Sequence, residues 1–459
     1  MSVYIGNRTF YRRALSIALP IMMQQLIQSM VSLIDNFMVA GLGDVAMSGV
    51  NVANQVLFVF MVFLNTICMS GGIYLTQYFG AEDPAGMQQA FRFKIITALL
   101  SFIPYMLVCA VFPRQVLSLM LIGNTDASAI LDQGVAYVRL MLFVGLQMSI
   151  SVCIATSLRD TGEVRTPLVI SIIATCINTF FNWVLIYGHF GAPALGVRGA
   201  ALATVTARSI ELLLYIIVCI RRKPAFVFRP WQLLQVNGAL FVEILKKGGM
   251  VLVSEMTWVL AETITTALYN GRGGADVVSG MSSSFAIANL FFVAFGGTTA
   301  AISVILGSTL GAGKLEDARR QSKWLLSGSL MLGLIMTGFA MLTTFLIPLV
   351  FGRLSNEAIT ICRNMVILMA FFMPVWLYTI SQLAVSRAGG DTLMGATADA
   401  FLTVFVMIPS VFILAIFTDI GPIGLYFSVK LIDVVKAVVF HQWLKRERWL
   451  RNLAAENKI

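Results

Sequence analysis

A carboxylate lies within a long apolar stretch near the start of the chain. Residues 20–43 are apolar enough to cross a bilayer, yet they contain Asp35. An ionised carboxylate at the centre of a membrane helix costs about 2.5–3.5 kcal/mol, so such a group normally faces protein or water. Steps of three and four residues place further polar side chains on its helix face: Gln25, Gln28 and Ser32. We expect a hydrated face on which Asp35 binds a proton or cation; the alternative is solvation at the outer end of the helix.

Two later segments also carry polar side chains with helical spacing. Asn178 and Asn182 are four residues apart and share a helix face. Their amides suit either ligation of a cation or hydrogen bonding to a carboxylate. Glu255 and Glu262 are seven residues apart and again share a face. The pattern does not rank one of these two glutamates over the other.

Charged residues near the end of the chain repeat at intervals of three. Lys430, Asp433 and Lys436 follow this spacing, which is typical of an internal salt-bridge ladder or of snorkelling side chains. A ligand site is the alternative. Arg208 and Glu211 have the same spacing and the same interpretation.

Enzyme signatures are scarce. The two histidines, His189 and His441, supply neither a metal cluster nor a histidine-dependent triad. The segment 307–314, GSTLGAGK, misses the phosphate-loop spacing because Ser308 occupies the first glycine position. The sequence therefore predicts a protein that is not an enzyme.

The composition is that of a polytopic membrane protein. The chain has 459 residues, of which 58% are hydrophobic and 12% charged, whereas soluble domains carry about 25% charged residues. Its basic residues lie in short connections, which argues against nucleic-acid binding. Twelve apolar blocks have bilayer length: 14–40, 48–78, 91–112, 130–157, 166–188, 197–220, 241–269, 277–309, 322–347, 358–386, 393–417 and 421–444.

Lys and Arg concentrate in alternate connections, including residues 221–247. The positive-inside rule then places both termini in the cytoplasm of a multi-pass protein of the cytoplasmic membrane.

The chain repeats itself at about half its length. Gly80-Ala81 in YFGAEDPAGMQQAFRFK aligns with Gly311-Ala312 in TLGAGKLEDARRQSKW. Two halves of six spans begin on the same side, which predicts an all-α fold of two six-helix lobes related by a pseudo-two-fold axis along the membrane normal. Transporters of this kind bind substrate between the lobes. The predicted parts are an N-lobe at 1–220, a cytoplasmic connection at 221–240 and a C-lobe at 241–459.

Three stretches carry a family resemblance. Residues 178–208, NTFFNWVLIYGHFGAPALGVRGAALATVTAR, resemble the N-x3-N/D…G-x-P-x-LG-V-x-GAA-x-AT pattern of the multidrug and toxic compound extrusion (MATE) family. LPIMMQQ…LIDNFMVAGLG is similar to that family's first helix, and SLRDTGEVRTP (157–167) to its LR-x-G-D-x-x-P turn. The resemblance covers essentially the whole chain and is strongest in the first half.

The resemblance implies a cation-coupled antiporter with twelve helices and a large central cavity. Asp35 matches the coupling carboxylate, Asn178 and Asn182 the polar pair of helix five, and Thr204 the hydroxyl of helix six. Many relatives have a second Asp where this chain has Asn182. A site with one carboxylate has less charge to hold sodium, so protons are favoured, with a sodium ion at Asp35, Asn178 and Asn182 as the alternative. No other cofactor is implied.

The C-lobe departs from the NorM-like branch. That branch has a Glu on helix seven and an Asp on helix ten, where this chain has Trp258 and Trp376. The chain therefore looks nearer the DinF-like branch. The expected substrates are small organic solutes, cationic or aromatic, and the expected state is a monomer. The predicted cavity residues are Gln25, Gln28, Ser32, Gln55, Glu255, Glu262, Trp258 and Trp376.

Two rival functions remain at this stage. A flippase for lipid-linked precursors or oligosaccharides has a related architecture and needs arginines for pyrophosphate. Here Arg139 and Arg208 are the obvious intramembrane arginines, and neither belongs to a cluster. A membrane-embedded enzyme or a channel is the other rival. The enzyme would need a catalytic constellation, and the channel would need a short filter-like re-entrant segment. The sequence shows neither feature, which argues against both rivals.

Overall fold

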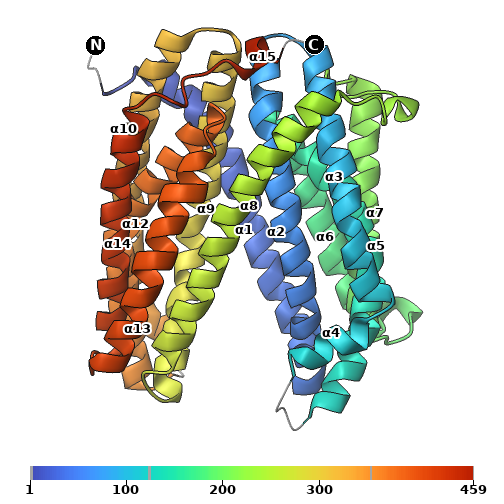
Figure 1. Ribbon diagram of the computed structural model, residues 1–459. Helices are drawn as coiled ribbons and strands as arrows, with labels where there is room; N and C mark the ends of the chain where they lie inside the picture. The colour runs from blue at the N-terminus through green and yellow to red at the C-terminus, as the bar shows by residue number, and fades with distance from the viewer. Residues whose placement is uncertain (1–3, 122–125, 352–353, 458–459) are drawn as a thin grey trace. The chain divides into compact units, whose positions relative to one another are not determined.

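The computed structural model describes residues 4–121, 126–351 and 354–457, and it is built from helices (Figure 1). Eleven helices of the described ranges have the length and hydropathy of membrane spans. They are α1 (Arg8–Ala40), α2 (Asp44–Gly80), α3 (Pro84–Ala110), α5 (Ala127–Asp160), α6 (Arg165–Tyr187), α7 (Val197–Arg222), α8 (Gly238–Asn270), α9 (Ala275–Gly311), α10 (Leu315–Thr343), α12 (Asn356–Ala388) and the stretch Met394–Phe417, which ends in α13 (Ile408–Phe417).

The twelfth predicted span is α14 (Pro422–Leu444), which has 23 residues. Its length suffices to cross a bilayer, but three charged side chains lie within it: Lys430, Asp433 and Lys436. Short helices α4 (Pro113–Leu119), α11 (Ile347–Val350) and α15 (Leu453–Glu456) complete the set. The all-α fold predicted from the sequence is confirmed.

Several helices begin earlier than the apolar blocks predict. α3 begins at Pro84 instead of residue 91, because Asp83 caps it by accepting hydrogen bonds from the backbone N–H groups of Ala85 and Gly86 over 3.0 and 3.1 Å. Proline at the first helical position strengthens this start. Hydropathy finds the apolar core of a span but not its polar first turns.

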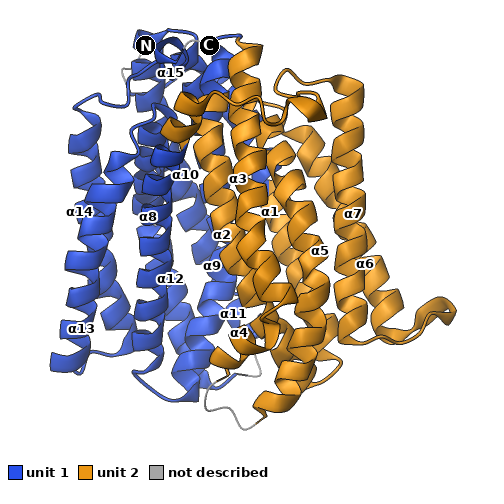
Figure 2. Cartoon of the chain, turned by 45° about the vertical axis from the view of Figure 1, so that its right-hand side comes forward, with its two compact units in different colours: residues 1–22, 76–82, 245–458 blue, residues 23–75, 83–244, 459 orange. Residues whose placement is uncertain are grey.

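The chain forms two compact units (Figure 2). Unit 1 comprises residues 1–22, 76–82 and 245–458, and unit 2 comprises 23–75, 83–244 and 459. The first part of α1 and the end of α2 thus pack with the second half of the chain. The lobe boundaries predicted at 1–220, 221–240 and 241–459 stay predictions.

The ends of α2 and α9 cross closely within unit 1. A Cβ atom on Gly80 would lie 2.0 Å from the backbone oxygen of Ser308, and one on Gly311 would lie 1.8 Å from the backbone oxygen of Gln77. Gly80 and Gly311 are equivalent in the sequence repeat. Gln77 and Ser308 are equivalent too, because each lies three residues before its glycine. Such reciprocal contacts are those of a two-fold axis, as expected for a parallel repeat.

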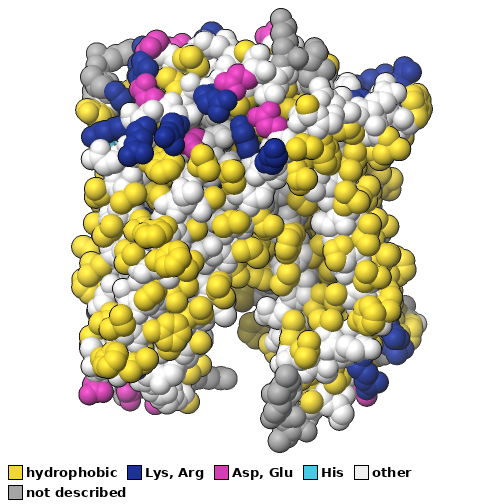
Figure 3. Space-filling model, in the orientation of Figure 1, with side chains coloured by type: hydrophobic (Ala, Val, Ile, Leu, Met, Phe, Trp, Pro, Cys, Tyr) yellow, Lys and Arg dark blue, Asp and Glu magenta, His cyan; other side chains and the backbone are white. Residues whose placement is uncertain are grey.

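The start of α1 and the segment around α15 are both held at one end of unit 1 (Figure 1). Tyr11, near the start of α1, donates a hydrogen bond to the backbone oxygen of Trp324 in α10 over 3.1 Å. Asn452, before α15, donates to the backbone oxygen of Gly311 over 3.2 Å. On the face drawn in Figure 3, hydrophobic side chains cover the middle of the helices, while Lys and Arg side chains gather near the end that carries α15.

Candidate functional site

Helices α1, α6 and α7 of unit 2 bring four of the predicted residues together. Asn182 of α6 donates its side-chain N–H to Oδ1 of Asp35 over 2.7 Å and to Oδ1 of Asn178 over 3.3 Å. Asn178 donates to the hydroxyl of Thr204 in α7 over 3.3 Å. Asn178 and Asn182 are 8% and 2% exposed, so this amide pair is removed from solvent. The four residues predicted to couple a cation thus form one continuous chain of polar contacts.

The local sequence explains this arrangement. The four-residue spacing keeps Asn178 and Asn182 on one face of α6. Gly188 ends α6 with φ 79°, a left-handed conformation that glycine adopts without strain. The chain then turns into α7, where Gly199 allows a close approach: a Cβ there would lie 2.3 Å from the backbone oxygen of Leu185. This tight α6–α7 packing brings Thr204 to the asparagines.

The amide of Asn178 has two useful orientations. In one it donates to Thr204, and its oxygen atom faces the Asp35 carboxylate. In the other its nitrogen donates to Asp35 Oδ1 over 3.1 Å and to Oδ2 over 2.9 Å. The second orientation satisfies both ends of the amide, because its nitrogen donates to the Asp35 carboxylate while its oxygen faces the hydroxyl of Thr204.

Two further features of this region bear on its chemistry. Arg208 and Glu211 form an ion pair of 2.6 Å within α7, which confirms the internal pairing predicted from their spacing. Because Arg208 is already paired, it offers little to the pyrophosphate of a flippase substrate. Tyr137 of α5 is 7% exposed and interacts with the hydroxyl of Thr204. No sequence signal pointed to Tyr137, because a tyrosine within an apolar block resembles ordinary core.

The predicted cavity residues of unit 2 lie around α1 and α2. Gln28 donates to the hydroxyl of Ser171 over 3.3 Å. Gln25 is half-buried, and Ser32 and Gln55 are exposed. Their membership of one substrate cavity stays a prediction.

The predicted cavity residues of unit 1 have separate partners. Glu255 pairs with Arg387 of α12 over 2.9 Å, whereas Glu262 pairs with Lys430 of α14 over 2.5 Å. Trp258 is 57% exposed. The two glutamates share a face of α8, yet each meets a different helix.

The charged residues of α14 make their ion pairs and hydrogen bonds with residues of other segments. Lys436 contacts Asp399 over 2.8 Å and donates to the hydroxyl of Thr403 over 2.7 Å. Asp433 accepts a hydrogen bond of 2.7 Å from the indole N–H of Trp376. These groups therefore tie α14 to neighbouring segments across unit 1.

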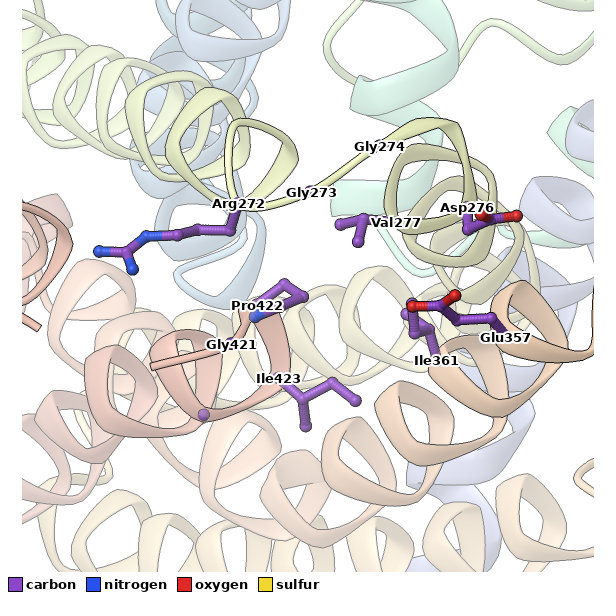
Figure 4. Close-up of a pocket in the computed structure, with 11 residues that line it drawn as sticks. Arg272, Gly273, Gly274, Asp276, Val277, Glu357, Ile361, Gly421, Pro422 and Ile423 are labelled. Atoms are coloured by element: carbon purple, nitrogen blue, oxygen red, sulfur yellow. The ribbon is translucent and has the colours of Figure 1, made fainter. Parts of the chain in front are cut away.

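A pocket of about 440 Å³ lies elsewhere in unit 1, where α8 joins α9 and where α14 begins (Figure 4). Asp276 and Glu357 line it together with glycine backbone, and the side chain of Arg272 extends away from it. Arg272 donates to the carbonyl oxygen of Leu414 in the last turn of α13 and to that of Thr418, which follows the helix. None of the predicted site residues lines this pocket. Among the described residues, no group of three or more His, Cys, Asp or Glu side chains is arranged to hold a metal ion.

The chain belongs to the MatE family, whose model matches residues 20–184 and 251–413. MATE proteins are transporters, so the prediction of a transporter and not an enzyme is confirmed. The first matched range contains all of residues 157–167, the first-helix stretch from Pro20 onward and the start of residues 178–208.

Curated relatives agree with this assignment. The chain is 24% identical over 326 residues to a probable multidrug resistance protein NorM of Thermotoga maritima, covering 69% of this chain and 67% of the relative. It is 22% identical over 461 residues to the multidrug resistance protein MdtK of Yersinia enterocolitica, covering 96% and 95%. These matches do not resolve the branch, so a position nearer the DinF-like proteins stays a prediction.

Solved structures support the fold. A crystal structure of MATE in the straight conformation superposes with a TM-score of 0.84 at 17% identity, covering 97% of each chain. The prediction of a twelve-helix, two-lobe MATE fold is therefore confirmed. The protein is a multi-pass membrane transporter.

Proposed function

We propose that the protein exports small organic solutes across the cytoplasmic membrane in exchange for protons, with Asp35 as the proton-binding group. The observation that carries this proposal is the contact between Asp35 and Asn182, which places an acid beside a buried amide pair. Asn178, Asn182 and Thr204 are assigned to the same coupling site.

The choice of the proton rests on the donor set. The site has one carboxylate, whereas hard metal cations prefer several charged or neutral oxygens around them. The Asn178 amide lies 2.9 and 3.1 Å from the two Asp35 oxygens, which is hydrogen-bond spacing. A sodium ion at Asp35, Asn178 and Asn182 is the alternative that the same oxygens support.

The substrate class follows from the relatives. Those described above are named multidrug resistance proteins, which supports organic, cationic or aromatic solutes. We assign both termini to the cytoplasm and a monomeric state, as the distribution of Lys and Arg and the two-lobe architecture suggest.

Coupling requires that each ligand binds the two transport states with different affinity. Protonation of Asp35 removes the charge that Asn182 and one orientation of Asn178 stabilise. The α1–α6 contact then has a different strength in the two protonation states. This difference is the basis on which an external proton shifts an inward–outward equilibrium and drives release of the solute.

The test is exchange in proteoliposomes that contain Asp35→Asn. We expect uptake driven by an imposed pH gradient to fall to the level of empty liposomes, while Asp44→Asn, an exposed acid at the start of α2, retains it. A parallel series with an imposed sodium gradient separates the two ions. Undiminished proton-driven exchange by Asp35→Asn would remove Asp35 from the mechanism.

A further inference from the structure

The connection between α7 and α8, residues 223–237, is folded against the start of α3 within unit 2 (Figure 1). Gln89 of α3 donates to the backbone oxygen of Gln235 over 3.0 Å and accepts from the backbone N–H of Asn237 over 3.0 Å. Arg92 of α3 donates to the same oxygen of Gln235 over 2.7 Å. These contacts fix the connection to one helix, so it is an ordered element and not a loose linker.

Aromatic packing holds the connection to the same helix. Phe226 is 0% exposed, and its ring centroid lies 4.9 Å from that of Phe91 in α3. The ring of Phe228 lies 5.6 Å from that of Phe91, and the guanidinium of Arg92 lies 5.1 Å from the Phe228 ring centroid. Part of the apolar content of the connection is therefore packed inward on α3.

Two other apolar side chains of the connection are left uncovered. Trp231 is 71% exposed and Leu234 is 84% exposed, and the guanidinium of Arg229 lies 5.5 Å from the Trp231 ring centroid. Trp231 lies in the short turn η2 (Pro230–Gln232), which Gln232 closes by accepting a hydrogen bond from the backbone N–H of Arg229 over 3.1 Å. The structure thus holds an exposed indole in a defined turn.

The charge around these side chains has one sign. Residues 221–242 contain no acidic side chain and four basic ones: Arg221, Arg222, Lys223 and Arg229. Arg222 lies 3.7 Å from Glu163. The other three are exposed, and no acid of the described residues pairs with them. An anionic partner would supply the missing counter-charge.

We define the connection patch as Arg221, Lys223, Arg229, Trp231 and Leu234. α7 and α8 both have the length and hydropathy of membrane spans, so the segment that joins them lies at the surface of the bilayer. Tryptophan is enriched at that depth, because its ring is apolar and its N–H is polar. Basic side chains there are attracted by the negative surface potential of anionic lipids. A phospholipid supplies the anion and the apolar layer together, and the patch needs both.

We propose that the connection patch binds anionic phospholipid, with Trp231 and Leu234 inserted between the headgroups and the three cations on the phosphates. This inference goes beyond the proposed function and does not depend on proton binding at Asp35. The bound lipid holds the connection between the two halves of the sequence at the membrane surface.

The experiment measures quenching of Trp231 fluorescence by lipids with brominated acyl chains, which quench an indole only on contact. The full chain is reconstituted in phosphatidylcholine vesicles that contain either brominated phosphatidylglycerol or brominated phosphatidylcholine. The signal lost in Trp231→Phe separates Trp231 from the other tryptophans. We expect phosphatidylglycerol to reach half-maximal quenching at a mole fraction about tenfold lower than phosphatidylcholine.

Two pairs of arginines separate the patch from charge in general. Arg221→Gln combined with Arg229→Gln should remove the preference for phosphatidylglycerol. Arg114→Gln combined with Arg198→Gln removes two exposed arginines at the opposite ends of α3 and α7 and should keep the preference. Soluble glycerol 3-phosphate should not compete, because it lacks acyl chains.

Equal quenching by the two lipids in the unaltered chain would overturn the proposal, as would loss of the preference when Arg114 and Arg198 are replaced. Absence of quenching at Trp231 would also overturn it, because the patch would then face water and be open to an acidic protein partner. Displacement by glycerol 3-phosphate would assign the patch to free phosphate esters instead of lipid. Trp231→Tyr supplies the same comparison if Trp231→Phe does not fold.

Discussion

Asn182 donates its side-chain N–H to Oδ1 of Asp35 over 2.7 Å, although the two residues are 147 positions apart in the chain. The contact joins α6 to α1 within unit 2 and is continued by Asn178 to Thr204. It converts an isolated intramembrane acid into a site with defined donors and acceptors.

Replacement of Asn182 with Asp tests how the donor set selects the ion. A second carboxylate beside Asp35 gives the site the negative charge to hold a hard cation. When no cation is bound, the two carboxylates repel each other. We expect sodium to stabilise Asn182→Asp against thermal unfolding in detergent, with about tenfold higher sodium affinity than the unaltered protein. Asn36→Asp adds a carboxylate on another face of α1 and is the control; equal sodium stabilisation in both variants would contradict the assignment.

The contribution of the Thr204 hydroxyl to exchange can be measured against Thr206, a second threonine of α7. Thr204→Val removes the acceptor used by Asn178, while Thr206→Val removes a hydroxyl that donates to the backbone oxygen of Leu202 in its own helix over 2.8 Å. We expect Thr204→Val to reduce proton-driven exchange by about tenfold, the loss that one hydrogen bond of about 1 kcal/mol or more produces, and Thr206→Val to retain it. Initial rates in proteoliposomes measure the difference, and equal rates for the two variants would exclude Thr204 from the site.

A buried ion pair between α3 and α5 is expected to dominate the stability of unit 2. Lys94 Nζ lies 2.6 Å from Oδ2 of Asp160, with side-chain exposures of 0% and 18%. Lys94→Met leaves a largely buried carboxylate without its partner, so we expect a loss of about 3–5 kcal/mol in the free energy of unfolding. Lys94→Met combined with Asp160→Asn should recover much of this loss.

The control for this ion pair is an exposed one. Arg114 and Asp132 lie 2.7 Å apart but are 63% and 66% exposed, so Arg114→Met is expected to change the free energy of unfolding by at most about 1 kcal/mol. Denaturant unfolding in detergent compares the variants. If Lys94→Met and Arg114→Met lower the free energy of unfolding by similar amounts, burial does not increase the contribution of the Lys94–Asp160 pair to stability.

The crossing of α2 and α9 gives a fourth prediction. Gly80→Ala and Gly311→Ala each place a Cβ within 2.0 Å of backbone atoms, which no rotamer change relieves. We expect each to cost about 1–3 kcal/mol. Gly249→Ala, in α8, would add a Cβ with no neighbouring atom within 4 Å, and it should be neutral or gain up to about 1 kcal/mol. If Gly80→Ala and Gly311→Ala leave the thermal unfolding temperature unchanged, then α2 and α9 can move apart at this crossing at little cost in free energy.

Much of the fold could be predicted because membrane spans leave a local signal. Apolar blocks located the long helices, and the repeat around Gly80 and Gly311 indicated two similar halves. The exact starts of helices were missed, as at α3, because Asp83 and Pro84 form a cap that hydropathy does not report. The division of the chain into its two compact units could not be predicted from the sequence either, because the first part of α1 packs with the second half of the chain.

The candidate site was predicted unevenly. The helical spacing of Asn178 and Asn182 put them on one face, and the resemblance connected them with Asp35. For Glu255 and Glu262 the same argument predicted a shared face but not their partners, Arg387 and Lys430. Spacing orders residues around one helix and says nothing about which helix lies opposite.

The sequence by itself determined that this is a helical, multi-pass membrane protein with an intramembrane acid, because burial in lipid constrains composition residue by residue. Only the tertiary structure decided that Asn182 meets Asp35 and that the ammonium of Lys430 pairs with Glu262. Those contacts join distant segments, and they depend on which helices pack together, a property of the whole chain and not of any stretch within it.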